Sequence, residues 1–327
     1  MNRATADAAC EGVLKSTMAQ PGTRSGFIKG LRAFFTALKP LWYLLPALLI
    51  LGFWIYRPFI QTVYYSFIKW NMLPTSTPVG VGLNNYKMLL SLPDFGHSLI
   101  NTLWYVLGML PFSVVIPMLL AISTENLSRK AKNIYRALFF LPMIMPPVTV
   151  STVWSWLFHP ANGFINHALL SLGLIDTGIN FLTSERTAML SIIIIAGWKM
   201  IGFSTLMFSA ALTGIDKSYY EAADIDGSSR LRQTLTITLP LISPTAMFML
   251  MLSILFTAQW TFAYINVLTS GGPAGATTNI YYLMYVYGLK NFNIGMSSAA
   301  AILFFLLFGV IALILTAINK RLSFYDN

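Results

Sequence analysis

The sequence is poor in charged residues and nearly free of cysteine, and both shortages narrow what the chain is. Charged residues make up 10% of the 327 positions and hydrophobic residues 56%, whereas a soluble globular domain has roughly 25% and 45–50%. The single cysteine, Cys10, excludes an internal disulfide, and no Cys/His cluster has zinc-binding spacing. The composition therefore excludes an ordinary soluble domain and predicts no metal site.

Several classes of function also lack the residues that they need. There is no G-x-x-x-x-G-K-[ST] phosphate loop, so we do not expect the chain to hydrolyse ATP. Gly202-Phe203-Ser204 lacks the following glycine of a hydrolase nucleophile elbow, and no histidine lies at the centre of an apolar run. None of the 11 acidic residues lies in the middle of such a run, which counts against an ion-coupled secondary transporter, the alternative class. We predict no catalytic residue and no cofactor bound by this chain.

Long apolar runs are what the chain has instead. They recur at or above the length of about 18 residues that crosses a bilayer as a helix. Six such runs occupy about 41–67, 98–122, 134–158, 187–212, 241–266 and 297–318. The first is far longer than a signal-peptide core, so we expect it to be a retained span. Because a helix satisfies its own backbone hydrogen bonds in lipid, the fold class predicted is an all-α polytopic membrane protein with about six transmembrane helices.

The basic residues behind the net charge of +10 are distributed unevenly between the two sides of these runs. Fifteen of the 21 lie on one side, at Arg3, Lys15, Arg24, Lys29, Arg32, Lys39, Arg129, Lys130, Lys132, Arg136, Lys217, Arg230, Arg232, Lys320 and Arg321. Four lie on the other side, at Lys69, Lys87, Arg186 and Lys290. This bias predicts that both termini are cytoplasmic and that the basicity reports membrane topology and lipid contact, with no nucleic-acid partner.

One cytoplasmic connection stands out because it is acidic. Four of the 11 carboxylates lie in it, on Asp216, Glu221, Asp224 and Asp226. Ala222 and Ala223 are small, helix-favouring residues that let another surface approach closely, and Gly227 permits a tight turn. Ser228 and Ser229 are suited to cap a second helical stretch at 230–238, and Pro240 ends that stretch or begins the next membrane helix. The pattern predicts a helix–turn–helix element between two spans.

The third run contains Pro142, Pro146 and Pro147. Each proline removes a backbone hydrogen bond, so we expect this span to be bent or broken. Irregular backbone in a membrane is tolerated where it is buried in protein or lines a cavity. A static kink and a cavity-lining break are both consistent with the sequence.

The acidic connection and two other segments carry a resemblance to a known family. Glu221-Ala222-Ala223, three residues, Gly227, nine residues and then I-x-L-P (Ile237, Leu239, Pro240) match the coupling loop of ABC importer permeases, with Tyr220 before it and Asp226 inside it. Pro160–Asn166 resembles an outer segment ending in G-x-x-N, and Thr269–Pro273 resembles a T-x-G-G-P turn. From about residue 98 onward the chain is similar to the carbohydrate-type, maltose-family permeases. It departs from them at Asp216, often proline, and at Ala263, often acidic.

The resemblance implies the type I importer permease fold, with a cytoplasmic coupling-helix loop at about 213–240. The implied organisation is a basic cytoplasmic segment at 1–40, a transmembrane permease domain at 41–320 and a short cytoplasmic tail at 321–327. It also implies a bacterial inner-membrane location and a set of partners: a second homologous permease, two cytoplasmic ATPase subunits that bind ATP and Mg, and an extracytoplasmic solute-binding protein. The coupling residues implied are Tyr220, Glu221, Ala222, Ala223, Asp226, Gly227, Ile237, Leu239 and Pro240.

The cargo implied is a saccharide, and the resemblance extends to permeases of alginate importers, which favours an acidic oligosaccharide. Neutral oligosaccharides and glycerol-phosphate esters are alternatives. Candidate residues of the substrate pathway are Trp198, Lys199, Trp260, Tyr264 and Asn266. A lysine at mid-membrane is costly, so Lys199 is expected either to meet an acidic cargo or to have a structural or gating role. Tyr281 and Tyr285 share a helical face with residue 288, which suits an interfacial aromatic belt or a sugar-stacking surface.

Overall fold

A computed structural model describes residues 43–322 of the protein, except residues 74 and 126. The predicted segment 1–40 and residues 323–327 of the predicted tail lie outside the described residues. The chain divides into two compact units, Met1–Gln61 and Thr62–Asn327. In the first unit the described residues are helical from Tyr43, with a π-helical turn η1 (Gly52–Tyr56). The helix α3 (Arg57–Ser66) carries the boundary between the units.

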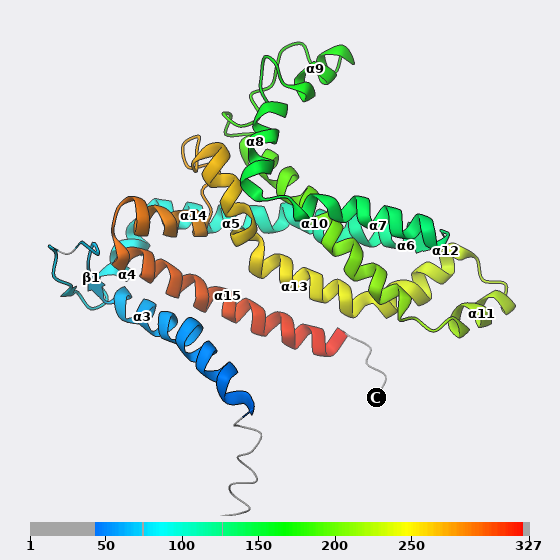
Figure 1. The fold of residues 1–327 in the computed structure, drawn as a ribbon, viewed down its shortest axis with the longest axis horizontal. Helices are drawn as coiled ribbons and strands as arrows, with labels where there is room; N and C mark the ends of the chain where they lie inside the picture. The colour runs from blue at the N-terminus through cyan, green and yellow to red at the C-terminus, as the bar shows by residue number, and fades with distance from the viewer. Residues whose placement is uncertain (1–42, 74, 126, 323–327) are drawn as a thin grey trace, which may run out of the picture. The chain divides into compact units, whose positions relative to one another are not determined.

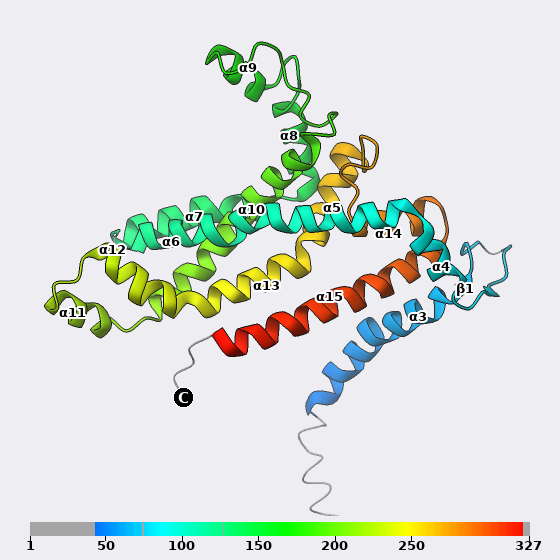
Figure 2. The same cartoon turned by 180° about the vertical axis from the view of Figure 1, so that it is seen from behind.

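The second unit is built almost wholly from long helices (Figures 1 and 2). Across the described residues, five helical segments are long and apolar enough to cross a membrane, or six when one bent pair counts as a span. This confirms the six runs predicted from the sequence. The first segment is Tyr43–Ser66, and the second consists of α5 (Pro93–Leu110), η2 (Pro111–Val115) and α6 (Ile116–Glu125). The bent pair is α7 (Arg129–Ile144) and α8 (Pro147–Leu157), and the next segment is α10 (Ala188–Thr213). The last two are the continuous run of α12 (Arg230–Gln233), η3 (Thr234–Thr238), α13 (Leu239–Tyr264) and η4 (Ile265–Thr269), and the single helix α15 (Ile294–Leu322).

The fifth of these segments is longer than the sequence predicted. Helical backbone runs without interruption from Arg230 to Thr269, 40 residues in all. The interpretation in which Pro240 ends the preceding stretch is therefore wrong, and Pro240 lies at the start of α13 instead. The π-helical turn just before it explains the difference, because the Leu239 amide donates to the Thr234 carbonyl and the hydrogen-bonding register has changed before the proline is reached.

The span with three prolines is broken, as the sequence predicted. The axes of α7 and α8 meet at 95°. Met145 and Pro146 are extended, with ψ of 133° and 137°, and α8 starts at Pro147, whose missing N–H costs nothing at a helix start. In both views α8 and the short helix α9 (Phe164–Ser171) project away from the other helices of the second unit.

Short elements fill the connections. Strand β1 (Ile68–Lys69) pairs antiparallel with β2 (Val79–Gly80), with Ile68 opposite Gly80 and Lys69 opposite Val79. The helix α4 (Asn84–Ser91) follows, and the Asn85 side chain donates to the carbonyls of Ser66 and Ile68, both at 2.9 Å. The remaining short elements are α11 (Ser218–Ile225), α14 (Ile280–Tyr285) and η5 (Val286–Lys290).

α10 is the central helix of the second unit. Within its most apolar 18-residue stretch, 61% of the residues are buried, against 6% in α15. It packs against α5, α6, α7 and α13. One apolar core cluster joins α10 to α5 and α8 around Tyr105 and Ile192, and another joins it to α6 and α13 around Phe208 and Met249. A displacement of α10 would therefore also displace the spans that pack against it.

The connection between η4 and α14 is tied firmly to α5. The Asn101 amide donates to the carbonyls of Gly275 and Thr278, both at 3.0 Å. The Tyr105 hydroxyl donates to the Thr277 carbonyl at 3.1 Å, and the Ile280 amide donates to the Thr102 hydroxyl at 3.0 Å. These four bonds join residues more than 170 positions apart in the sequence. They fix the start of α14 against α5.

Candidate functional site

The acidic connection forms a helical hairpin, α11–α12, at one end of the second unit (Figure 1). α10 ends at Thr213 and α11 begins at Ser218. The carboxylate of Asp216 accepts a hydrogen bond from the Ser218 amide at 2.9 Å, which satisfies one of the free donors at the start of α11. Asp216 thus supplies the hydrogen-bond acceptor at the start of α11.

The Ser218 backbone amide, followed by the Ser218 side chain, lowers the pKa of Asp216 below its ordinary value of 3.8. A carboxylate whose pKa is lower in the folded state stabilises that state above its unfolded pKa and ceases to do so as pH falls through the folded pKa. We therefore expect Asp216→Ala to accelerate hydrogen exchange in the first turn of α11 at neutral pH, with the difference from wild type vanishing as pH falls through the lowered pKa of Asp216. An unchanged difference at low pH would show that the carboxylate charge is not what supports the turn.

The turn between α11 and α12 is centred on Gly227, whose φ is +69°. The Gly227 amide donates to the Asp224 carbonyl at 3.1 Å and the Ser228 amide to the Ala223 carbonyl at 2.9 Å, which closes the end of α11. The Ser229 hydroxyl accepts from the Arg232 amide at 3.4 Å and caps α12. A glycine fits this backbone without strain because it has no Cβ.

Two side-chain contacts that the sequence did not reveal hold the hairpin closed. Gln233 is 2% exposed, and its amide donates to the Asp224 carboxylate at 2.5 Å and to the Ser228 carbonyl at 3.2 Å. The hydroxyls of Tyr220 and Thr238 lie 2.9 Å apart. Tyr220, predicted only as a coupling residue, thus also joins α11 to η3. These contacts join α11 to the start of the following span.

The outer surface of the hairpin is open to solvent. No residue of α11 is buried. Ile225 is 88% exposed and Leu231 is 70% exposed, and Glu221 and Ala222 are also exposed. The hairpin therefore presents both apolar and polar side chains to solvent.

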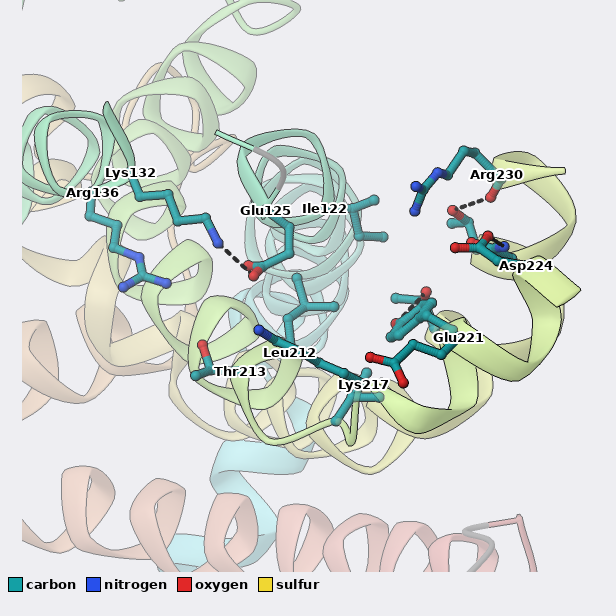
Figure 3. Close-up of a pocket in the computed structure, with 15 residues that line it drawn as sticks. Ile122, Glu125, Lys132, Arg136, Leu212, Thr213, Lys217, Glu221, Asp224 and Arg230 are labelled. Atoms are coloured by element: carbon teal, nitrogen blue, oxygen red, sulfur yellow. Dashed lines mark hydrogen bonds and ion pairs between the residues drawn. The ribbon is translucent and has the colours of Figure 1, made fainter. Parts of the chain in front are cut away.

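A cavity of about 670 Å³ lies behind the hairpin (Figure 3). It is bounded by the ends of α6, α7 and α10 on one side and by α11, α12 and η3 on the other. Its charged lining residues are Glu125, Lys132, Arg136, Lys217, Glu221, Asp224 and Arg230. The Lys132 ammonium and the Glu125 carboxylate form an ion pair at 2.6 Å across the α6–α7 connection. The hairpin is thus separated from the ends of α6, α7 and α10 by a polar gap of mixed charge.

The five candidate residues of the substrate pathway lie in a different region, around α10 and the end of α13. Lys199 is 8% exposed, and its ammonium donates to the Met145 carbonyl at 2.5 Å. Tyr264 is 3% exposed and belongs to the apolar core cluster around Tyr105. None of the five residues lines the cavity behind the hairpin, and none lines the second cavity, which is described below.

The other three candidates are only partly buried. Trp198 packs edge-on against Trp154 of α8, with ring centroids 5.8 Å apart. Trp260 stacks on Phe256, with ring centroids 5.9 Å apart. Asn266 lies in η4, where its carbonyl accepts from the Ser270 hydroxyl at 3.4 Å. Contact with cargo stays a prediction for these residues.

A second cavity, of about 340 Å³, is lined by aromatic residues. Tyr281, Tyr285 and Gly288, which the sequence placed on one helical face, all line it, and Phe262 joins them. The ammonium of Lys290 lies nearby, donating to the Tyr282 hydroxyl at 2.8 Å. An aromatic belt and a sugar-stacking surface are both compatible with this arrangement.

The family is decided by a match between residues 113–324 and the model of the "Binding-protein-dependent transport system inner membrane component" family. The chain belongs to this family. It is also 32% identical, over 285 residues, to the sn-glycerol-3-phosphate transport system permease protein UgpA of Agrobacterium fabrum, covering 86% of this chain and 94% of the relative. Its identity to UgpA of Pectobacterium atrosepticum is 30% over 274 residues, covering 84% and 91%.

Among solved structures, the chain resembles a bacterial ABC transporter "involved in the import of the acidic polysaccharide alginate". The TM-score is 0.77 at 26% identity, covering 89% of this chain and 99% of that one. This likeness agrees with the predicted importer permease fold. The protein is thus a multi-pass inner-membrane permease subunit of a binding-protein-dependent importer.

Proposed function

We propose that this permease forms half of a translocation pathway for an anionic saccharide and that the α11–α12 hairpin docks on a cytoplasmic ATPase subunit. The observation that carries the proposal is the hairpin itself. It is closed by side-chain hydrogen bonds, it is solvent-exposed, and it connects directly to two spans through α10 and α13. In a permease that has no phosphate loop of its own, such an element suits delivery of force from another subunit.

The docking surface is assigned to α11 around Glu221, Ala222 and Ala223, three consecutive residues that extend over more than half of the helix circumference. Glu221 also lines the charged cavity behind the hairpin. The two alanines allow close approach of the partner, and Glu221 offers a carboxylate for a polar or ionic contact. Asp226, Gly227, Ile237, Leu239 and Pro240 complete the proposed coupling loop. Ile237, Leu239 and Pro240 belong to η3 and α13, so they act by joining the hairpin to its span.

The assembly proposed has a second homologous permease, two ATPase subunits that bind ATP and Mg, and an extracytoplasmic solute-binding protein. The bias of Lys and Arg supports an orientation with the hairpin and both termini in the cytoplasm. Closure of the ATPase dimer on ATP would displace the hairpin, and α10 and α13 would carry that displacement into the spans. The translocation pathway between the two permeases would then open outward to receive cargo, and ATP hydrolysis would return it to the inward-facing state.

An anionic cargo is favoured because several proteins similar to this one are named for anions. The related crystal structure is of an importer of the acidic polysaccharide alginate, and the UgpA relatives belong to sn-glycerol-3-phosphate systems. We propose an acidic oligosaccharide such as an alginate fragment as the cargo. sn-Glycerol-3-phosphate is the second candidate, supported by the 32% identity to UgpA.

Two measurements test this proposal. An affinity-tagged chain purified from its native membrane is expected to bring down an ATPase at about one copy per permease, and the absence of an ATPase would refute the docking role. In proteoliposomes containing the purified assembly and its binding protein, alginate oligosaccharides are expected to compete with radiolabelled uptake. sn-Glycerol-3-phosphate and a neutral oligosaccharide of equal length serve as comparisons. Equal competition by the neutral sugar would end the argument for an anionic cargo.

A further inference from the structure

The break between α7 and α8 leaves backbone carbonyls without their usual helical partners. Pro146 and Pro147 have no N–H, so they cannot bond to the carbonyls four residues earlier in the chain. The Met145 amide bonds to the Pro142 carbonyl at 3.3 Å, and among the described residues no backbone N–H donates to the Met145 carbonyl. In a membrane, a free carbonyl has no water to bond with and must be satisfied by protein.

Lys199 satisfies this carbonyl. It lies on α10, 54 residues along the chain, and its ammonium donates to the Met145 oxygen at 2.5 Å. The side chain is 8% exposed, and no carboxylate lies within ion-pairing distance of it in the part of the chain that the structure describes. The positive charge is placed at the C-terminal end of α7, where the helix dipole is negative. The lysine is thus already engaged by backbone.

α10 also contacts the helices on both sides of the break. On the α7 side Gly202 packs so closely that a Cβ there would lie 2.6 Å from the carbonyl carbon of Phe139. On the α8 side Trp198 packs edge-on against Trp154. In the sequence of α10, Lys199 lies between Trp198 and Gly202. Because it is three residues from Gly202, the two residues lie on the same face of the helix. The same helix then leads, within five residues of its end, to the coupling hairpin.

We infer that Lys199 is a positioning residue for transport. Its bond to the Met145 carbonyl holds α7 and α8 in the bent state, so that the angle between these two helices changes when α10 moves. The transport part of this inference rests on the proposed function. The bend part does not, because it concerns two helices of this chain alone. On this account, the mid-membrane lysine is used to hold backbone, and its charge is not available to recognise cargo.

The test measures the bend directly in the assembled importer. The chain's single cysteine is first replaced by Cys10→Ser. Spin labels are then placed at Ile134→Cys on α7 and Val153→Cys on α8, which are 60% and 53% exposed. With a rise of 1.5 Å per residue, the bent form separates these positions by about 20 Å, and a straight helix would separate them by about 28 Å. Lys199→Met is expected to broaden the distances and shift them toward the longer value, while Lys199→Arg keeps the shorter one.

Uptake supplies the second measurement. Lys199→Met is expected to lower the maximal uptake rate about tenfold with the apparent KM within about twofold, as for loss of coupling between sites. Lys199→Arg should restore most of that rate. Lys87→Met, which removes the charge of an exposed lysine on α4 outside both cavities, is the control and should change neither measurement.

Two outcomes would overturn the inference. One is a wild-type distance distribution in Lys199→Met. The other is a large rise in the KM for an acidic oligosaccharide with distances unchanged, which would assign Lys199 to the cargo. If distances shift as expected but no anionic saccharide is transported, the positioning role stands and the proposed cargo fails.

Discussion

Gly227→Val is expected to abolish ATP-driven uptake while leaving the protein inserted in the membrane. A Cβ at this position would meet no atom within 4 Å, so the effect does not come from crowding. It comes from φ of +69°, a backbone conformation that is a genuine outlier for a β-branched residue. Valine would have to rotate the backbone, turn α12 relative to α11 and so misplace the proposed docking face. We expect uptake to fall by at least about tenfold, with ATP hydrolysis no longer stimulated by the loaded binding protein.

The chain offers a closely matched control for this prediction. Gly173 has φ of +66° and also has no neighbour within 4 Å of a built Cβ, but it follows α9, outside the hairpin. Gly173→Val should impose similar strain, about 1–2 kcal/mol, without disturbing stimulated ATP hydrolysis. Gly227→Asn, which tolerates a positive φ, should keep most of the uptake. Equal loss of uptake in both valine variants would mean that strain in general, and not the hairpin turn, is responsible.

Gly202→Val is expected to have the largest effect on stability. A Cβ there would overlap the Phe139 carbonyl group and lie 2.8 Å from the Cα of Phe140. These are backbone atoms, so no side chain can move aside, and α7 and α10 must separate. Overpacking of this kind costs about 1–3 kcal/mol or more. The separation would also break the Lys199–Met145 bond beside it.

Thermal unfolding of the purified protein in detergent measures this effect. Gly202→Val should lower the midpoint by several degrees, about what 1–3 kcal/mol gives in a protein of this size. Gly309→Val is the control, because Gly309 also lies within a helix, α15, and a Cβ there would meet nothing within 4 Å. A wild-type midpoint in Gly202→Val would show that the close approach of α7 and α10 does not contribute to stability.

The features that could be predicted from the sequence are those that depend on residues close together in the chain. Apolar length located the spans, the proline group located the break, and Gly227 with Ser229 located the hairpin turn. The continuous helix through Pro240 was not foreseen because a π-helical turn changes the hydrogen-bonding register just before it.

Contacts between distant segments could not be predicted in the same way. The partner of Lys199 is a backbone carbonyl 54 residues away, and a carbonyl is present at every position of the chain. A lysine alone therefore gave no means of choosing between bonding to cargo and bonding to backbone. Gln233 had no signal either, since its buried position depends on how the hairpin folds back over it. The charged cavity of Figure 3 arises only where α6 and α7 meet the hairpin in space.

The four hydrogen bonds between α5 and the segment leading into α14 restrict the movement of these two elements relative to each other. In both views α14 lies well away from α11. A displacement that enters at α11 would therefore be largest near that hairpin and would diminish toward α14. The α5–α14 junction would then act as the pivot, so a small displacement of the hairpin would tilt the long helices without separating α5 from α14.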